Sequence, residues 1–145
     1  MSEARESLYG TVKKVIDGDS LIVTAAGRDL EIRLYGIDAP EYNQPCGFEA
    51  KNYAKRWEGR QQVIVQPEDV DWHGRTVAII TKDGQVLNRE LVESGWAWVY
   101  PRYCRKEICT KWTELEDVAR NKRKGLWRDA KPIAPWLWRR KEDSR

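Results

Sequence analysis

The sequence predicts an α+β fold: a small β-barrel of five short strands, with about three helices packed against it. Three observations lead to this prediction. Five short segments rich in β-branched residues are separated by turn signals such as Asp-Gly and Ala-Gly. Three further segments, one between the strands and two after them, have helical spacing. No linker or internal repeat divides the 145 residues, so we expect one domain.

The predicted strands cover residues 8–16, 20–25, 29–35, 61–66 and 76–81. In the third strand apolar and charged residues alternate, which places Glu31 and Arg33 on the face opposite the leucines. A loop follows at 36–41, because Pro40 prevents a regular strand from continuing. Five strands on a Greek-key path form the OB-fold, a common platform for oligonucleotides. The pattern alone does not fix that path.

The predicted helices cover residues 47–58, 87–94 and 110–124. In the first, four apolar residues from Ala50 to Trp57 follow the i, i+3, i+4, i+7 spacing of one buried stripe. Each of the other two is followed by a glycine that ends it.

The two chain ends differ from this core. We expect a disordered N-terminus at 1–7, the folded domain at 8–128, and an irregular basic C-terminal arm at 129–145, which Pro132 and Pro135 interrupt. No apolar run reaches the ~18 residues that a membrane span needs. No signal peptide is recognisable, although a chain from which an export signal was removed would look the same.

Charge is unevenly distributed along the chain. Residues 1–101 carry 12 Lys or Arg against 16 Asp or Glu, whereas residues 102–145 carry 14 against 7. An acidic N-terminal part and a basic C-terminal part suit a protein that binds both a cation and a polyanion. A solvated basic helix and tail would give the same charges, so both interpretations stay open.

Three cysteines do not make a full disulfide framework. Cys104 and Cys109 are close enough in sequence for a small disulfide loop, which would leave Cys46 free or buried and would suit an oxidising compartment. Reduced, buried cysteines are an equal alternative. A zinc site from the three cysteines and His73 is formally countable, but its ligands are scattered along the chain.

Three acidic side chains and two arginines are the candidate catalytic residues: Asp19, Arg33, Asp38, Glu41 and Arg75. Two aspartates at separate strand ends can converge on one hard cation. A third carboxylate beside that cation can take a proton from a bound water. Two guanidinium groups can hold phosphate oxygens by paired, charge-assisted hydrogen bonds. Taken singly, each residue also fits a turn, a solvated loop or a surface ion pair.

The order and spacing of these residues resemble the staphylococcal nuclease-like, or thermonuclease, family. The resemblance covers about residues 8–127, most of the chain. Its motifs are V-I-D-G-D-S at 15–20, R-L-Y-G-I-D-A-P-E at 33–41, G-F-E-A-K at 47–51, D-x-x-G-R at 71–75, L-V-E-S-G-W-A at 91–97 and K-G-L-W at 124–127. The first two motifs are the most specific, because together they are long and fix the acidic positions.

For the metal, the resemblance implies Ca²⁺ held by Asp19, Asp38 and the main-chain carbonyl of Ala39. The best-known member of the family has Thr in place of Ala39. A backbone ligand survives that change, so only a side-chain contact would be lost. Hard-oxygen sites of this kind are weak until a phosphate completes the coordination shell.

For the reaction, the resemblance implies that Glu41 is the general base and that Arg33 and Arg75 bind the phosphate and stabilise the transition state. Such enzymes attack phosphorus with water, release the 5′-oxygen and leave 3′-phosphorylated products from DNA or RNA. We therefore expect a Ca²⁺-dependent endonuclease that prefers single-stranded or unpaired substrate.

Two segments depart from the family pattern near the nucleotide. Trp72 and His73 stand where the prototype has a Lys and a Tyr, and they either bind substrate or cover core. Tyr100 and Tyr103 fall near the family's base-stacking tyrosines, although Pro101 shifts the register. Stacking on an aromatic ring contributes about 1–3 kcal/mol per base and tolerates any sequence. We therefore expect weak base preference.

Two further segments, at 103–109 and in the C-terminal tail, bear on compartment and on substrate binding. The Y-C-x4-C segment at 103–109 resembles a disulfide-bearing insertion of some bacterial relatives, which favours a secreted, periplasmic or otherwise extracytoplasmic protein. In the tail, Trp136, Trp138, Arg139 and Arg140 either extend the binding surface or cap the barrel.

The main alternative is a catalytically inactive OB-fold module that binds nucleic acid or a protein. Relatives that lose activity generally lose the acidic and arginine positions, all five of which are present here. An EF-hand starting at Asp69 is excluded, because its twelfth position is Ile80, which cannot supply the acidic ligand. We expect the protein to be a monomer.

Overall fold

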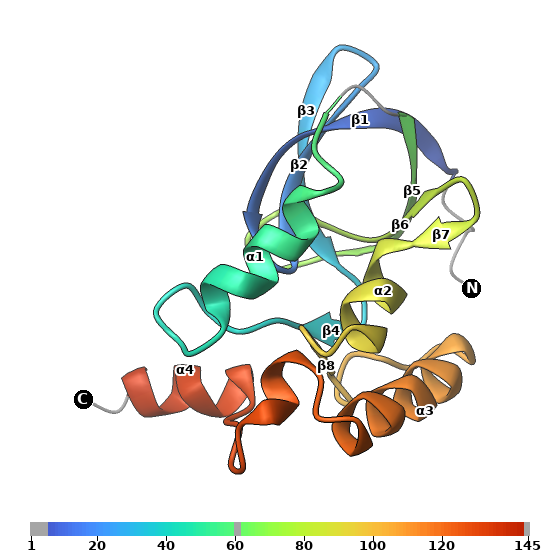
Figure 1. Ribbon diagram of the computed structural model, residues 1–145. Coiled ribbons are helices and arrows are strands. Elements are labelled where there is room, and N and C mark those ends of the chain that lie inside the picture. The colour runs from blue at the N-terminus through green and yellow to red at the C-terminus, as the bar shows by residue number, and fades with distance from the viewer. Residues whose placement is uncertain (1–5, 60–61, 144–145) are drawn as a thin grey trace.

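The computed structural model describes residues 6–59 and 62–143. Figure 1 shows a barrel at one end of the molecule and a group of helices below it. The predicted disorder at 1–7 falls mostly on residues 1–5, which lie outside the described residues; the first strand begins at Leu8.

Five long strands form the barrel: β1 (Leu8–Asp17), β2 (Ser20–Ala25), β3 (Arg28–Leu34), β5 (Gln62–Val70) and β6 (Thr76–Lys82). β1 pairs with β2 and β5, β2 pairs with β3, and β5 pairs with β6, all in antiparallel fashion. A parallel pairing between β3 and β6 closes the ring. The predicted α+β fold with a five-stranded, OB-fold-like barrel is therefore confirmed.

Alternation along the strands fills the barrel with aliphatic side chains, because every second residue points inward. The innermost are each at most 1% exposed: Val12, Val15, Leu21, Val23, Ile32, Leu34, Val63, Val65 and Ile80. β5 continues to Val70, beyond residue 66, where the predicted strand ends. A register irregularity between Pro67 and Asp69 accommodates the missing N–H.

Three strands of two residues each were not predicted: β4 (Ile37–Asp38), β7 (Gln85–Val86) and β8 (Trp98–Val99). Two residues are too few to show an alternating pattern. β4 pairs with β8 in a separate small sheet, with Asp38 opposite Trp98. This small sheet fixes the loop that carries the second candidate aspartate.

Three of the helices match the prediction, with shifted ends: α1 (Gly47–Lys55), α2 (Leu87–Glu93) and α3 (Ile108–Asn121), which a single 3-10 turn η1 (Gly125–Arg128) follows. α1 buries Ala50 and Ala54 against the barrel. α3 buries the fully enclosed ring of Trp112. Gly95 and Gly125 allow α2 and α3 to end side by side, because a Cβ at either glycine would overlap the backbone of the other segment.

The C-terminal arm is not irregular, because a fourth helix, α4, spans Pro135–Asp143. The prolines misled the sequence interpretation, since proline is tolerated in the first turn of a helix, where its missing N–H has no partner to lose. Ala134 and the start of α4 pack in a second core cluster with Trp98 and Trp127. Figure 1 shows α4 lying below the loop between β4 and α1.

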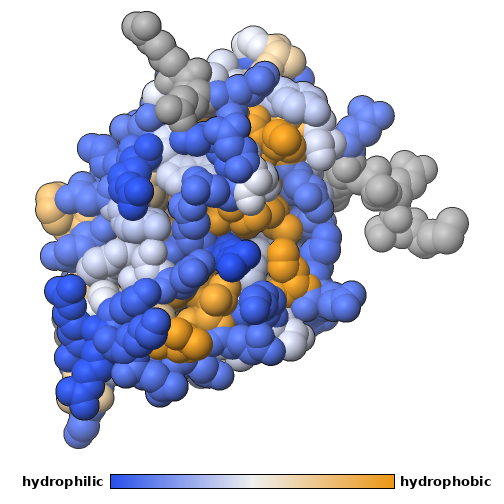
Figure 2. All heavy atoms as spheres, turned by 45° about the vertical axis from the view of Figure 1, so that its right-hand side comes forward, coloured by the Kyte–Doolittle hydropathy of each residue, from blue (hydrophilic) through white to orange (hydrophobic). Residues whose placement is uncertain are grey.

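The surface is heavily charged. Figure 2 shows one face, on which hydrophilic residues surround small apolar areas. In the part of the chain that the structure describes, no helix is both long and apolar enough to cross a membrane.

Candidate active site

Asp19 lies in the tight turn between β1 and β2, where Gly18 allows close approach to the loop after β4. A Cβ added at Gly18 would lie 2.8 Å from the Cβ of Ala39 and 3.0 Å from the Cβ of Ala50. Asp19 Oδ2 accepts a 2.7 Å hydrogen bond from the backbone N–H of Ala39. Close packing and one charge-assisted hydrogen bond therefore join the turn to the loop.

Arg33 brings the two candidate metal ligands together. Its Nη1 lies 2.8 Å from Asp19 Oδ2, and its Nη2 donates a 3.1 Å hydrogen bond to Asp38 Oδ1. The Asp38 side chain is fully buried, and those of Asp19 and Arg33 are only 11% and 16% exposed. Because one guanidinium group contacts both carboxylates, Asp19 and Asp38 converge as the sequence predicted.

Glu41 follows in the loop between β4 and α1, where a compact turn holds its backbone. Its N–H donates to Gln44 Oε1 at 3.1 Å, and its carbonyl accepts the N–H of Gln44 at 2.9 Å. Gly47 passes so near this carbonyl that any Cβ there would overlap it. The Glu41 side chain is 33% exposed, so water has access to its carboxylate, as a general base requires.

A third arginine, Arg139 of α4, contacts the same carboxylates. Its Nη1 donates to Glu41 Oε1 at 2.6 Å and to Asp38 Oδ1 at 3.1 Å, and its Nη2 donates to Asp38 Oδ2 at 2.6 Å. The sequence placed Arg139 in a tail without assigning it a contact. A helix beginning at Pro135 would have put Trp136 and Arg139 on one face, three residues apart.

Negative charge exceeds positive charge in this cluster. Burial raises the pKa of Asp38 to about 6, against the hydrogen bond from Arg139, and the charge of Asp19 adds to the rise. Burial, followed by the charges of Asp19 and Glu41, also raises the pKa of Asp17. Carboxyl groups whose pKa values are raised by burial and by one another become easier to ionise when a cation is added.

The donor set fits a hard cation. Asp19 and Asp38 offer carboxylate oxygens, and the main-chain carbonyl of Ala39, whose N–H is bonded to Asp19, is the candidate third donor. Among residues 6–59 and 62–143, no group of three or more His, Cys, Asp or Glu side chains forms a metal site. A cation here would therefore depend on two aspartates, main chain, water and a phosphate. Ca²⁺ accepts such a shell, since it takes roughly six to eight oxygen ligands and tolerates water.

Arg75 lies one strand away from this cluster, immediately before β6. β6 pairs with β3 so that Val77 is opposite Arg33, which places Arg75 on the same face as Arg33. Its Nε donates to Asp71 Oδ2 at 2.8 Å, and Asp71 Oδ1 also accepts the backbone N–H of Arg75. The described contacts of Arg75 are thus with Asp71 and not with the three candidate carboxylates.

Trp72 and His73 lie in the turn between β5 and β6. The Trp72 ring is fully exposed, so the interpretation that it covers core is wrong. His73 is also exposed, and its backbone N–H donates to Asp71 Oδ1 at 2.9 Å. Both side chains remain candidates for substrate binding.

Tyr100 and Tyr103 lie together, with ring centroids 4.8 Å apart in an edge-on arrangement. Tyr103 is 55% exposed. One face of Tyr100 is covered by Trp136 of α4, which stacks on it with a centroid distance of 4.6 Å and an interplanar angle of 16°. The position in which a base would stack on Tyr100 is therefore shared with α4.

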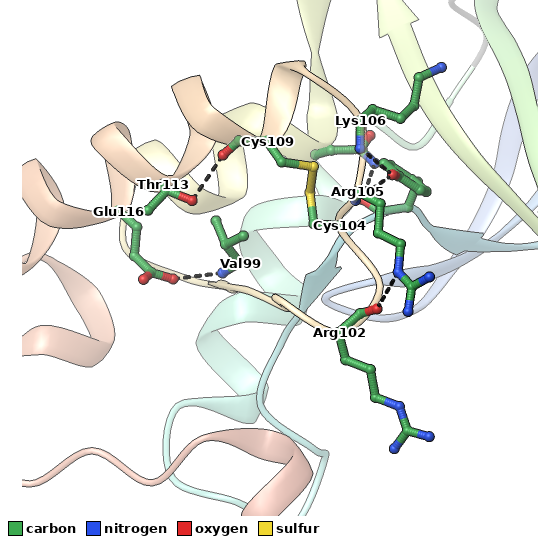
Figure 3. The surroundings of a disulfide bond; sticks show 10 residues. Val99, Arg102, Cys104, Arg105, Lys106, Cys109, Thr113 and Glu116 are labelled. Atoms are coloured by element: carbon green, nitrogen blue, oxygen red, sulfur yellow. Dashed lines mark hydrogen bonds between the residues drawn. A yellow bond between two sulfur atoms is a disulfide. The ribbon is translucent and has the colours of Figure 1, made fainter.

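Cys104 and Cys109 form a disulfide, with Cα atoms 5.8 Å apart, and Cys46 is free. The pairing excludes both the reduced and the zinc interpretations. Figure 3 shows the bonded loop beside α3, with the Arg102 side chain directed away from the sulfur atoms. The Tyr35 hydroxyl accepts the N–H groups of Arg105 and Lys106 at 2.9 and 3.0 Å. The loop is thereby fastened to the segment that leads to β4.

Comparisons with known proteins show which proteins this chain is similar to. A family model described as "Staphylococcal nuclease homologue" matches residues 31–129. "Protein ParB" of Escherichia coli is 33% identical over 153 residues, which cover 99% of this chain and 86% of the relative. "Micrococcal nuclease" of Shigella flexneri is 36% identical over 140 residues, covering 90% and 80%. An "Uncharacterized endonuclease" of Escherichia coli O157:H7 is 34% identical over 136 residues, covering 93% and 87%.

Proposed function

The chain belongs to the staphylococcal nuclease family, and from that premise we propose that it is a Ca²⁺-dependent endonuclease acting on DNA and RNA. The observation that carries the proposal is the convergence of Asp19 and Asp38 on the single guanidinium group of Arg33. The proposed preference is for single-stranded or unpaired substrate, which allows bases to stack on exposed rings.

Asp19, Asp38 and the carbonyl of Ala39 are the proposed ligands of the cation. When bound, Ca²⁺ supplies positive charge beside the scissile phosphate and makes a bound water easier to deprotonate. The two aspartates hold this charge at the end of β3, next to Arg33. Their burial keeps bulk water from screening it.

Glu41 is the proposed general base. Its carboxylate accepts a proton from the water that attacks phosphorus, and the 5′-oxygen leaves, so that the phosphate stays on the 3′ end of the product. Arg33 supplies N–H groups to the phosphate oxygens as negative charge grows. A general base of this kind is worth roughly 10²–10⁴ in rate.

Arg75 is the proposed second phosphate-binding residue. Asp71 contacts it through Nε, so the terminal nitrogens of its guanidinium group are not used in that ion pair. The planar guanidinium group of an arginine can donate two parallel hydrogen bonds to two phosphate oxygens, whereas the ammonium group of a lysine cannot. Trp72, His73, Tyr100 and Tyr103 are the proposed contacts to the flanking nucleotides.

The test is cleavage of heat-denatured DNA in Ca²⁺ and in EGTA, followed by analysis of the product ends. We expect cutting only with Ca²⁺, and products that a polymerase extends only after a phosphatase has removed the 3′-phosphate. Products that the polymerase extends without phosphatase treatment would carry a 3′-hydroxyl, which would exclude release of the 5′-oxygen. DNA binding without cleavage in either buffer would favour the alternative, a catalytically inactive OB-fold module that binds nucleic acid or a protein.

A further inference from the structure

The contacts of α4 coincide with the groups to which the proposed function assigns metal and base chemistry. Arg139 donates to both carboxylate oxygens of Asp38 and to Oε1 of Glu41, at 2.6–3.1 Å. Its guanidinium group therefore places positive charge between the proposed metal ligand and the proposed base. A cation that is coordinated by these oxygens must compete with the hydrogen bonds from Arg139.

α4 is held in this position by aromatic and polar contacts on the same side of the molecule. The Trp136 ring stacks on Tyr100 at 4.6 Å and meets the edge of Trp98 at 5.6 Å. The Trp138 indole N–H donates to Asn43 Oδ1 at 3.2 Å, in the loop that carries Glu41. Figure 1 shows the helix running beside this loop.

We propose that α4 is an autoinhibitory cap, in which Arg139 competes with Ca²⁺ for Asp38 while Trp136 covers the face of Tyr100 where a base would stack. Binding of the cation and a nucleotide then requires Arg139 and Trp136 to leave. The inference rests on the proposed function, because it assigns regulation to that same site. Charge supports it: within residues 6–59 and 62–143, Asp38 contacts the guanidinium groups of Arg33 and Arg139, so removal of Arg139 leaves that of Arg33 alone.

The first test is the affinity of the full-length protein for Ca²⁺ alone, measured by titration calorimetry without nucleic acid. We expect Arg139→Gln to bind Ca²⁺ at least tenfold more tightly than the parent, a change of about 1.4 kcal/mol. Arg140→Gln is the matched control, because Arg140 is the exposed neighbour on α4 and its loss removes the same charge. Equal affinities for the two variants, or no Ca²⁺ binding by any of the three proteins, would overturn the proposal.

The second test is hydrogen–deuterium exchange of the α4 amides in the parent protein. We expect saturating Ca²⁺ with a short single-stranded oligonucleotide to speed exchange over 136–143, because the helix leaves its contacts. A purely structural role for α4 predicts unchanged or slower exchange, and that result would overturn the proposal. Neither readout requires cleavage, so failure of the cap and failure of the nuclease assignment are distinguishable.

Discussion

Gly18 lets the turn that carries Asp19 pack against Ala39, the neighbour of Asp38, so its replacement by alanine tests how the fold makes the site. A Cβ at Gly18 would lie 2.8 Å from the Cβ of Ala39 and 3.0 Å from that of Ala50. Carbon atoms prefer separations of about 3.5–4.0 Å, so the turn and the loop must move apart by roughly 0.7–1.2 Å. Neither neighbour can yield by rotating, since both are methyl groups on backbone.

This displacement separates Asp19 from the loop that carries Asp38 and Glu41. The 2.7 Å hydrogen bond from Ala39 to Asp19 would stretch past its useful range. A misplacement of about 1 Å can cost about 10² in rate, and overpacking costs about 1–3 kcal/mol in stability. We therefore expect Gly18→Ala to stay folded at 25 °C while Ca²⁺-dependent kcat/KM on denatured DNA falls about a hundredfold.

Gly27→Ala is the matched control for Gly18→Ala. A Cβ at Gly27 meets nothing within 4 Å, but its φ of +73° strains any other residue. Gly27→Ala should therefore lower the stability of the protein through a turn that does not contact the candidate site. The measurements are kcat/KM and the midpoint of urea unfolding for both variants. A Gly18→Ala enzyme as active as Gly27→Ala would refute the claim that this contact sets the site.

Two further predictions concern the disulfide and the buried carboxyl. A disulfide that closes a loop this short stabilises the fold by about 2 kcal/mol, because it restricts the unfolded chain. The double change Cys104→Ser, Cys109→Ser should therefore lower the free energy of unfolding in urea by that amount, whereas Cys46→Ser should not. Equal losses in the two proteins would contradict this prediction. Asp38 has a pKa of about 6 when folded, against an ordinary value of 3.8. The folded state holds more protons between these values, so stability in EGTA should fall by about 2 kcal/mol as pH rises from 4 to 6. The difference between the parent and Asp38→Asn isolates this contribution, and a difference that grows in favour of the parent over that range would show the sign to be wrong.

The barrel was predictable because its strands carry their own signal. Alternation in β3 placed Ile32 and Leu34 inside and Arg33 on the other face, and the structure agrees. β4 and β8 were missed because two residues show no period. α4 was missed because Pro135 was interpreted as a break and not as the first residue of a helix.

The sequence predicted the part of the candidate site that Asp19, Asp38 and Arg33 form. Asp19 and Asp38 follow strand ends that the motif fixes, so their convergence could be expected. The contacts of Arg139 depend on how α4 packs, about 100 residues further along the chain, and no local pattern encodes that. The pairing of Arg75 with Asp71 similarly depends on the shape of the turn between β5 and β6.

The most direct test of the account is the single-turnover rate of Glu41→Gln on denatured DNA with saturating Ca²⁺, beside Glu49→Gln at an exposed position on α1. The amide keeps the shape of the side chain but cannot accept the proton of the attacking water. We predict a rate lower by roughly 10²–10⁴ for Glu41→Gln, with DNA binding retained and Glu49→Gln unchanged. A Glu41→Gln protein that cuts as fast as the parent would contradict the account.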